Sequence, residues 1–407
     1  MAEFEVITPM FLGDGLQQAK DIRPPAIKGA LRFWWRAINW SKFYQTEGQN
    51  EKAALKALHT KEAELFGSSA KTVDGQQVGG QGKVAIKLTQ KLKESNGWSP
   101  SGSAQYLLGM GLHHFKSGLL RDYIASGSTF TLHLLCRDLS NEDQADIVGV
   151  VKAMGLLGGL GARARKGLGS VSITELSVEN RNSQSKEYIT LPNDAKSYVS
   201  AIQSLLANCG GSSLPPFTAF SKDSLVDLSF TDKSADAVFT KVGNSLQMYR
   251  SYGRNGKVNG QKTIQLFKYD HDLMLENRQT QLPKRAVFGL PHNYFFSSAK
   301  KKVDVNAVSR SGEARRASPL FIHVHKLSDQ EFLAVQLLLP AVFLDSYEHQ
   351  VEIKTQKKGT QKLSVQNNSF DYQVIRNYMT LPKYQTEQGS YPGFQNRQQI
   401  WPIKEGN

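Results

Sequence analysis

Hydrophobic and polar positions along the first half of the chain predict alternating strands and helices. Two segments alternate apolar and polar residues over eight positions each, KVAIKLTQ (83–90) and TFTLHLLC (129–136), as half-buried strands do. Strand patterns cover 4–12, 83–90, 129–136 and 169–178, and helix patterns cover 25–40, 50–66 and 141–157. The helix at 141–157 has Ser140 or Asn141 as its cap. Strand, helix, strand, strand, helix, strand is the ferredoxin-like order, in which two helices cover one sheet face and leave the other free to bind.

The second half is harder to interpret. A helix is predicted over 235–252 and strands over 284–289, 318–326 and 333–344, with a polar linker at 179–222. In the first half, residues 94–120 form a Gly- and Ser-containing insertion that could hold a hairpin or a mobile loop. We therefore expect an α+β fold of two ferredoxin-like (RRM-like) domains with loop and helical insertions, one over 1–195 and one over 196–407.

Charge and composition favour an anionic partner and a cytoplasmic protein. The chain has 50 Lys and Arg against 36 Asp and Glu, a net charge of +14, which suits binding of phosphate groups. Two cysteines are too few for a disulfide framework or a cysteine zinc site, so a reducing compartment is expected. The N-terminus lacks a signal peptide and no apolar run is long enough to span a bilayer, so no membrane partner is expected.

The strongest local motif is IRPPAIKGALRFWWRA, residues 22–37. On a helix, one stripe faces the core: Ile27, Leu31, Trp34 and Ile38. Candidate RNA contacts lie beside that stripe or just before the helix: Arg23, Lys28, Arg32, Trp35 and Arg36. The alternative is a solvated basic face beside a Trp-rich core, and at least one of the two tryptophans is expected in the core.

The second motif is the Gly-rich segment GLLGGLGARARKGLGSV, residues 155–171. Its glycines allow close approach of backbone to a ligand, and Arg163, Arg165 and Lys166 suit a sugar–phosphate backbone. The segment also matches the dinucleotide pattern GxGxxA, but it is predicted to follow a helix and precede a strand, the reverse of that fingerprint. A hinge without ligand is the other alternative.

A third, diffuse basic region with interleaved aromatic residues covers 241–316 and suits single-stranded nucleic acid. Its cations are Lys241, Arg250, Arg254, Lys257, Lys262, Lys268, Arg278, Lys284, Arg285, Lys300, Lys301, Lys302, Arg310, Arg315 and Arg316. From this region Arg285, His292, Arg315 and Arg316 are predicted RNA contacts. The alternative for any one of them is a solvated surface charge.

Catalytic and metal-binding patterns are weak. On a strand His323 and His325 would share a face, but no cysteine or acid stands at ligand spacing, so neither a metal nor another cofactor is expected. His292 could serve as a general base on a ribose 2′-hydroxyl, although a contact or packing role is favoured.

Taken together, IRPPAIKGALRFWWRA and GARARKGLGSV resemble the first-subunit family of the type III-B CRISPR Cmr effector complex, within the RAMP superfamily. ITPMFLGDG (7–15) and RRASPLFIHV (315–324) are similar to that family as well. The resemblance implies a non-catalytic subunit that assembles with other Cmr subunits, the RAMP backbone and cap subunits. It would help to hold the 3′ part of the crRNA and the 5′ part of the target RNA in antiviral defence.

Two other functions stay open. A RAMP endoribonuclease that processes precursor crRNA would need a general acid or base, for which His292, His113 and His114 are the candidates. A nucleotide-binding enzyme would use the Gly-rich segment.

Overall fold

The computed structural model describes most of the chain, and two of the predicted basic residues, Arg254 and Arg278, lie outside the described residues. The described ranges are 1–73, 76–95, 97–100, 102–180, 185–252, 257–276, 281–344, 349–355, 359–364, 370–385, 389–394 and 397–403.

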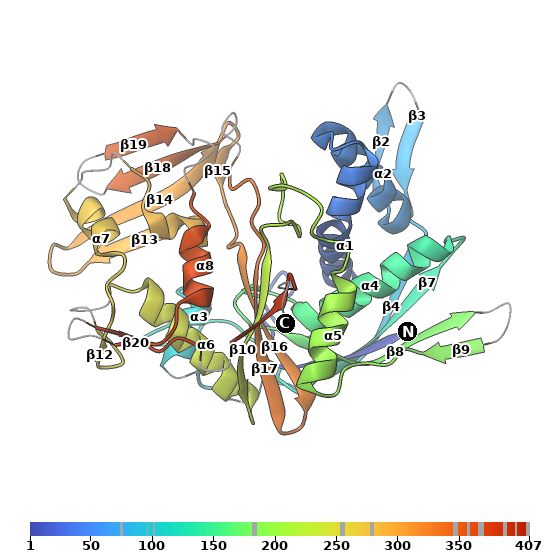
Figure 1. The fold of residues 1–407 in the computed structure, drawn as a ribbon, viewed down its shortest axis with the longest axis horizontal. Helices are drawn as coiled ribbons and strands as arrows, with labels where there is room; N and C mark the ends of the chain where they lie inside the picture. The colour runs from blue at the N-terminus through green and yellow to red at the C-terminus, as the bar shows by residue number, and fades with distance from the viewer. Residues whose placement is uncertain are drawn as a thin grey trace.

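The first half forms an antiparallel sheet with two helices on one face, in the ferredoxin-like order (Figure 1). Its strands in spatial order are β4 (Val84–Lys91), β7 (Thr129–Cys136), β1 (Ala2–Val6), β8 (Val171–Asn180) and β9 (Ser185–Tyr188). The helices are α1 (Pro24–Thr46) and α4 (Asn141–Leu157). Two prolines open α1, and the Ser140 hydroxyl caps α4 by accepting the N–H of Asp143.

The second half repeats this order with longer insertions. Its sheet runs β16 (Leu320–Ser328), β17 (Glu331–Leu338), β10 (Leu225–Asp232) and β22 (Gln398–Trp401), all antiparallel, with helices α6 (Ala235–Arg250) and α8 (Gln373–Thr380). Along the chain this is again strand, helix, strand, strand, helix, strand. The predicted α+β class with two ferredoxin-like domains is therefore confirmed. The boundary at 195/196 stays a prediction.

Insertions add a third sheet and several small elements. The third sheet contains β13 (His292–Phe296), β14 (Lys301–Ser309), β15 (Gly312–Ala314), β18 (His349–Thr355) and β19 (Gly359–Ser364). The remaining helices are α2 (Glu51–Phe66), α3 (Ser103–Leu108), α5 (Ala195–Leu205), α7 (Lys268–Leu275) and the 3-10 turn η1 (Lys284–Phe288). Short paired strands are β2 (Ser68–Val73), β3 (Gln76–Gly80), β5 (His113–His114), β6 (Gly118–Leu119), β11 (Lys257–Val258), β12 (Gln261–Lys262), β20 (Tyr384–Gln385) and β21 (Ser390–Tyr391).

Both faces of the second sheet are buried. Leu320, Ile322 and Val324 pack with α6 and α8 in one hydrophobic cluster. From the other face Phe321 packs with the first domain, its ring centroid 5.8 Å from that of Phe33 on α1. The centre of Figure 1 shows this sheet between the two sets of helices. In the first sheet, the face away from the helices is open along β4, where Lys87 is exposed.

Two local predictions were wrong, one for residues 284–289 in the second half and one for the linker 179–222 that leads to it. Residues 284–289, predicted as a strand, form η1, because the Asp270 carboxylate accepts the backbone N–H groups of Lys284 and Arg285 and fixes a turn. The predicted linker 179–222 contains β9 and helix α5, whose buried Tyr198 and Ile202 join the first core. None of the described helices is long and apolar enough to cross a membrane.

Candidate nucleic-acid interface

The Gly-rich segment forms a loop, residues 158–170, where the two domains meet. It follows α4 and leads into β8, so it does not open a helix as a dinucleotide fingerprint must. Backbone pairing ties it to the second domain, because the N–H of Ile322 donates to the carbonyl of Arg165 at 3.1 Å. Gly169 has φ of +59°, and a Cβ there would lie 2.0 Å from the carbonyl oxygen of Leu160. Glycine is therefore required for the loop to fold on itself.

Cationic side chains from both domains converge on this loop. We define the cationic cluster as Arg163, Arg165, Lys166, Arg250, Arg285 and Arg316, with His292 beside it. The positive charges of Arg250 and Arg163 both lower the pKa of Lys166, and those of Arg250 and Arg285 both lower the pKa of His292. These side chains therefore lie close enough to repel one another. Four elements supply them: the Gly-rich loop, the last turn of α6, η1 and the segment before β16.

Aromatic rings and carbonyl groups hold the guanidinium groups of the cluster. Arg165 lies over the ring of Phe321 at 4.4 Å and donates to the carbonyl of Ser318 at 2.8 Å. Arg250 lies over Phe288 at 4.5 Å, and Arg285 lies over Tyr294 at 4.7 Å. Such stacking orders a planar cation without neutralising it, so the positive charge stays available to a ligand.

Several buried N–H groups of the cluster have no hydrogen-bond partner in the part of the chain that the structure describes. They are Lys166 Nζ, Arg250 Nε, Arg285 Nε, and Nε and Nη2 of Arg316. Among the described residues, Asp270 is the one carboxylate that pairs with the cluster, 3.7 Å from Arg285 Nε, and it already accepts two backbone N–H groups. Buried donors without partners are costly. The cluster therefore offers the donors and the positive charge that an anion with several oxygen atoms would satisfy.

The pKa values of the cluster support this interpretation. Burial, and then repulsion from Arg250, Arg163 and Arg165, hold the pKa of Lys166 well below its usual value. Burial lowers the pKa of Arg165 to about 10, and burial with two arginines lowers the pKa of His292. An anion on the cluster would reverse these shifts, because it favours the charged forms.

The arginines predicted on α1 lie elsewhere and have protein partners. Arg32 and Arg36 both pair with Oε1 of Glu62 on α2, at 2.5 Å, and the Glu62 side chain is 3% exposed. The two arginine side chains are 31% and 34% exposed, so part of each guanidinium still faces solvent. Their first role is to join α1 to α2, and RNA contact by them stays a prediction.

Arg23 is closer to the Gly-rich loop. Its guanidinium donates to the carbonyl of Gly13 at 2.8 Å, and the neighbouring Phe11 carbonyl accepts the N–H of Ala162 in the loop. Arg23 is exposed and Lys28 is half-buried, without an ion pair to any described residue. The start of α1 and the Gly-rich loop therefore flank the same short segment.

The structure contradicts the predicted role of Trp35. It was predicted as a base-stacking residue, but its side chain is completely buried against Phe43 and Phe66. Helix α2 covers the face of α1 that carries Trp35, so its ring cannot reach a base. Trp34 is also buried, and both tryptophans belong to the core.

The remaining predicted residues lie at or near the cluster. Arg315 is exposed and repels Arg163, whereas Arg316 is half-buried over Phe343. Arg250 was not among the predicted contacts, although it was counted in the basic stretch. Its only sequence signal is a basic residue in the last turn of a helix, which is common.

Removing both α1 arginines tests their structural role. The double variant Arg32→Ala, Arg36→Ala leaves the Glu62 carboxylate buried and unpaired, so we expect the free energy of unfolding at pH 7 to fall by about 2 kcal/mol in urea titrations. Adding Glu62→Gln should restore most of the loss. An equal loss with and without Glu62→Gln would contradict the pairing.

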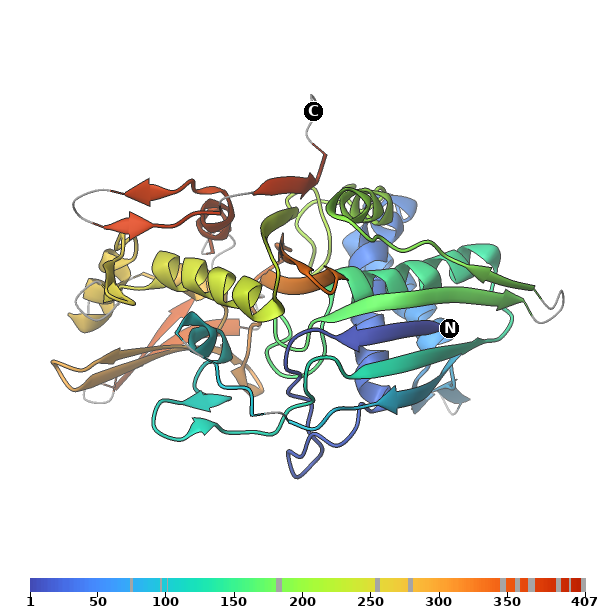
Figure 2. The same cartoon turned by 90° about the horizontal axis from the view of Figure 1, so that it is seen from below.

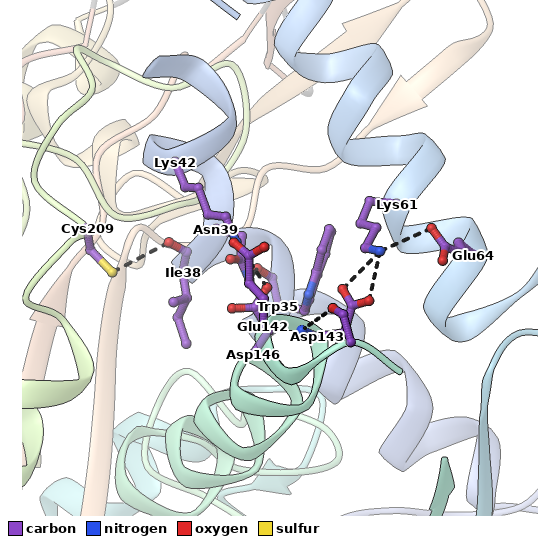
Figure 3. A network of polar contacts seen from close by, with 11 residues as sticks. Trp35, Ile38, Asn39, Lys42, Lys61, Glu64, Glu142, Asp143, Asp146 and Cys209 are labelled. Carbon is purple, nitrogen blue, oxygen red and sulfur yellow. Dashed lines mark hydrogen bonds and ion pairs between the residues drawn. The ribbon is translucent and has the colours of Figure 1, made fainter. Parts of the chain in front are cut away.

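A separate hollow of about 730 Å³ lies between α1, α4 and α5. Figure 3 shows three of its charged side chains, Lys42, Glu142 and Asp146. Lys42 pairs with Glu142 at 2.6 Å and with Asp146 at 3.5 Å, so these charges satisfy one another. This hollow therefore contains charges of both signs, in contrast to the cationic cluster.

Two further histidines, His323 and His325, lie side by side on β16. His323 and His325 are completely buried between the domains, with 3.4 Å between Nε2 of the first and Nδ1 of the second. In the part of the chain that the structure describes, no group of three His, Cys, Asp or Glu residues could hold a metal ion.

Comparisons with known proteins match the first domain to one superfamily. Residues 3–172 match the family model of the RAMP superfamily. Among solved structures, Cmr1 from Pyrococcus furiosus in its apo form is similar, with a TM-score of 0.49, 19% sequence identity and 98% of each chain covered. No curated protein matches the sequence.

Proposed function

We propose that the chain is a non-catalytic, RNA-binding subunit of a type III-B CRISPR Cmr interference complex, because residues 3–172 match the family model of the RAMP superfamily. In this proposal it helps to hold the 3′ part of the crRNA and the 5′ part of the target RNA. Its protein partners are the RAMP backbone and cap subunits. The resemblance of residues 22–37 and 161–171 to the Cmr first-subunit family supports the assignment within the superfamily.

The observation that carries RNA binding is the cationic cluster at the domain junction. Among the described residues, several of its buried N–H groups lack partners, and one carboxylate pairs with its six cations. Consecutive phosphates of an RNA strand supply oxygen acceptors and negative charge without requiring base recognition. The exposed Arg23 and Arg315 and the half-buried Lys28 extend the same path in the proposal.

The salt dependence of RNA binding tests this proposal. The double variant Arg163→Glu, Arg315→Glu reverses two exposed charges of the path, and we expect it to weaken binding of single-stranded RNA about tenfold at 150 mM salt. The slope of log affinity against log salt should fall by about 1.4 or more, since about 0.7 counterions are released per single-strand phosphate contact.

The control variant is Lys186→Glu, Lys354→Glu, which reverses two exposed or half-exposed lysines on β9 and β18 outside the cluster. It should leave both affinity and slope nearly unchanged. Equal weakening by both double variants would indicate nonspecific attraction by the net charge and would contradict a defined path.

One observation keeps precursor processing as a second candidate. His292 lies against the cluster with its pKa lowered by burial and by Arg250 and Arg285, so it is neutral at pH 7 and able to accept a proton beside a bound phosphate. Incubating the purified chain with precursor crRNA in the absence of metal separates the two. Cleavage that disappears in His292→Ala would replace the non-catalytic assignment, and intact RNA agrees with it.

A further inference from the structure

A small hairpin of the first domain carries exposed aromatic rings. Strands β5 and β6 pair His113 with Leu119 and His114 with Gly118, and Phe115 lies at the tip. The Phe115 side chain is 80% exposed, and its ring lies 4.7 Å from the ring of His114. Lys116 places its ammonium group 5.7 Å from the centre of the Phe115 ring. Leu112 and Leu119 anchor the hairpin in the second hydrophobic cluster, whereas the His114 and Phe115 rings at its tip are exposed.

The hairpin is fixed to both domains. Helix α3, which precedes it, packs on α6, where Gly243 lies so close that an added Cβ would be 2.7 Å from the carbonyl oxygen of Ser103. Tyr123, which follows it, packs on Phe11 with ring centroids 5.6 Å apart. These contacts hold the base of the hairpin in place, so the tip is presented without a large ordering cost on binding.

The base of the hairpin touches the cationic cluster. Arg163 lies directly over Gly109, since a Cβ added to Gly109 would be 3.1 Å from Nη2 of Arg163. The N–H of Leu112 donates to the carbonyl of Gly109, and the hairpin begins there. At about 3.3 Å per strand residue, Phe115 lies roughly 10 Å beyond Leu112, which is one to two nucleotide steps. A strand bound on the cluster therefore brings its bases within reach of the tip.

We propose that Phe115 and His114 form a stacking site for an unpaired base of the RNA whose phosphates lie on the cationic cluster. This inference rests on the proposed function and adds a base contact to it. Stacking on an aromatic face is tolerant of base identity, and nearby cations strengthen it. The site therefore increases affinity and fixes the position of one nucleotide without selecting a sequence.

The surrounding charge favours a nucleic acid over a protein as the occupant. Lys116 lies beside the Phe115 ring, Arg163 lies at the base of the hairpin and Arg121 follows its second strand, whereas Asp122 is the one acid within 109–125. At the tip Phe115 is flanked by His114, Lys116 and Ser117, whereas the exposed Met110 and Leu120 lie at the base of the hairpin, so the tip itself offers no contiguous apolar area for a protein.

Variants of Phe115 in the full chain test the stacking site. With fluorescein-labelled single-stranded RNA we expect Phe115→Ala to weaken binding about tenfold, because one base–aromatic contact is lost. Phe115→Trp should bind like the wild type. The salt slope should be unchanged in both, since no phosphate contact is removed. Phe115 is exposed, so both variants are expected to fold, as a thermal melt will verify.

The matched control is Tyr188→Ala on β9, at the far end of the molecule from the hairpin (Figure 2). Tyr188 is 62% exposed and carries Lys186 4.5 Å over its ring, the same chemistry away from the cluster. Its affinity should stay within twofold of the wild type. Equal losses for Tyr188→Ala and Phe115→Ala, or equal losses for Phe115→Ala and Phe115→Trp, overturn the stacking site.

The outcomes also separate this inference from the proposed function. If Arg163→Glu, Arg315→Glu weakens binding and Phe115→Ala does not, RNA binding stands and the stacking site fails. If Phe115→Ala instead abolishes capture of a protein partner with RNA affinity unchanged, the hairpin is a protein contact and the stacking site is overturned. Absence of RNA binding by the wild type overturns both proposals.

Discussion

Replacing Lys166 by methionine is expected to stabilise the RNA-free chain and to weaken RNA binding at the same time. The Lys166 Nζ is buried without a hydrogen-bond partner, and burial and three arginines lower its pKa. Below its unfolded pKa a lysine with a lowered folded pKa destabilises the folded state, and methionine keeps the volume without the charge. We expect a gain of about 1–2 kcal/mol in the free energy of unfolding at pH 7, measured in urea.

RNA affinity of the same variant should fall about 100-fold, because a desolvated charge-assisted contact contributes several times more than an exposed one. Lys241→Met is the matched control, since Lys241 is half-exposed on α6 and pairs with Asp232. It should lose less than about 1 kcal/mol of stability and no more than about twofold in affinity. A Lys166→Met variant that is less stable than the wild type would mean that Lys166 supports the fold rather than a ligand.

Opposite effects on stability and binding are what a site built for an anion should show. The uncompensated charge lowers the stability of the RNA-free protein, and a bound anion removes this destabilisation. No surface lysine with a carboxylate partner behaves in this way, because removing it costs a little of both or affects neither. The two measurements on one variant therefore distinguish a binding site from a basic surface.

The elements of the first domain could be predicted from sequence because each shows the hydrophobic periodicity of a strand or a helix. Strands β4 and β7 face solvent on one side, so apolar and polar residues alternate, and the bounds of β7 and α4 match the prediction. The helix caps were readable as well, since Ser140 and the early acids of α4 are local signals.

The second domain was much less legible for two physical reasons. Strands β16 and β17 are buried on both faces between the two sets of helices, so alternation is lost. The insertions that build the third sheet also separate α6 from β16 and β17 from α8 by many residues. The turn at η1 depends on Asp270, a tertiary partner that no local pattern reveals.

The site residues could be predicted only in part, and the wrong predictions arise because tertiary contacts decide which side chains are covered. The Gly-rich loop with Arg163, Arg165 and Lys166 has a composition that indicates anion binding wherever it lies. Which arginines face solvent depends on α2, whose Glu62 takes both Arg32 and Arg36. Covering by α2 also places Trp35 in the core. Sequence identified the cations, and tertiary packing decided which of them lack a partner.

Acid should destabilise the domain junction through the buried histidine pair. His323 Nδ1–H donates to the carbonyl of Gly158 at 2.7 Å, and His325 lies 3.2 Å from the Ser172 hydroxyl and packs on the Tyr198 ring. Burial lowers the pKa of His323 to about 4 and, with the neighbouring imidazole, lowers the pKa of His325 well below its usual value. Both rings are therefore neutral in the folded chain at pH 5 and charged in the unfolded chain.

Because both histidines have a lowered pKa in the folded chain, acid lowers the free energy of unfolding. Above the unfolded pKa of about 6.5, neither the folded nor the unfolded state binds these protons, so the two histidines do not reduce the free energy of unfolding. As the pH falls below about 6.5, the unfolded state binds protons and the folded state does not, so the free energy of unfolding decreases. Between pH 7 and pH 5 each histidine should cost about 2 kcal/mol, so the pair should cost about 4 kcal/mol in the free energy of unfolding.

Urea titrations at both pH values in the wild type and in His323→Gln, His325→Gln isolate this contribution, because carboxylates titrate alike in the two proteins. The double variant should lose about 4 kcal/mol less than the wild type on acidification, whatever its stability at pH 7. The control is His59→Gln, an exposed histidine on α2, which should keep the wild-type pH dependence. An unchanged pH dependence in the double variant would show that the pair is protonated in the folded state. In that case a proton shared between the two imidazoles would hold the domains together, and acid would leave the junction intact.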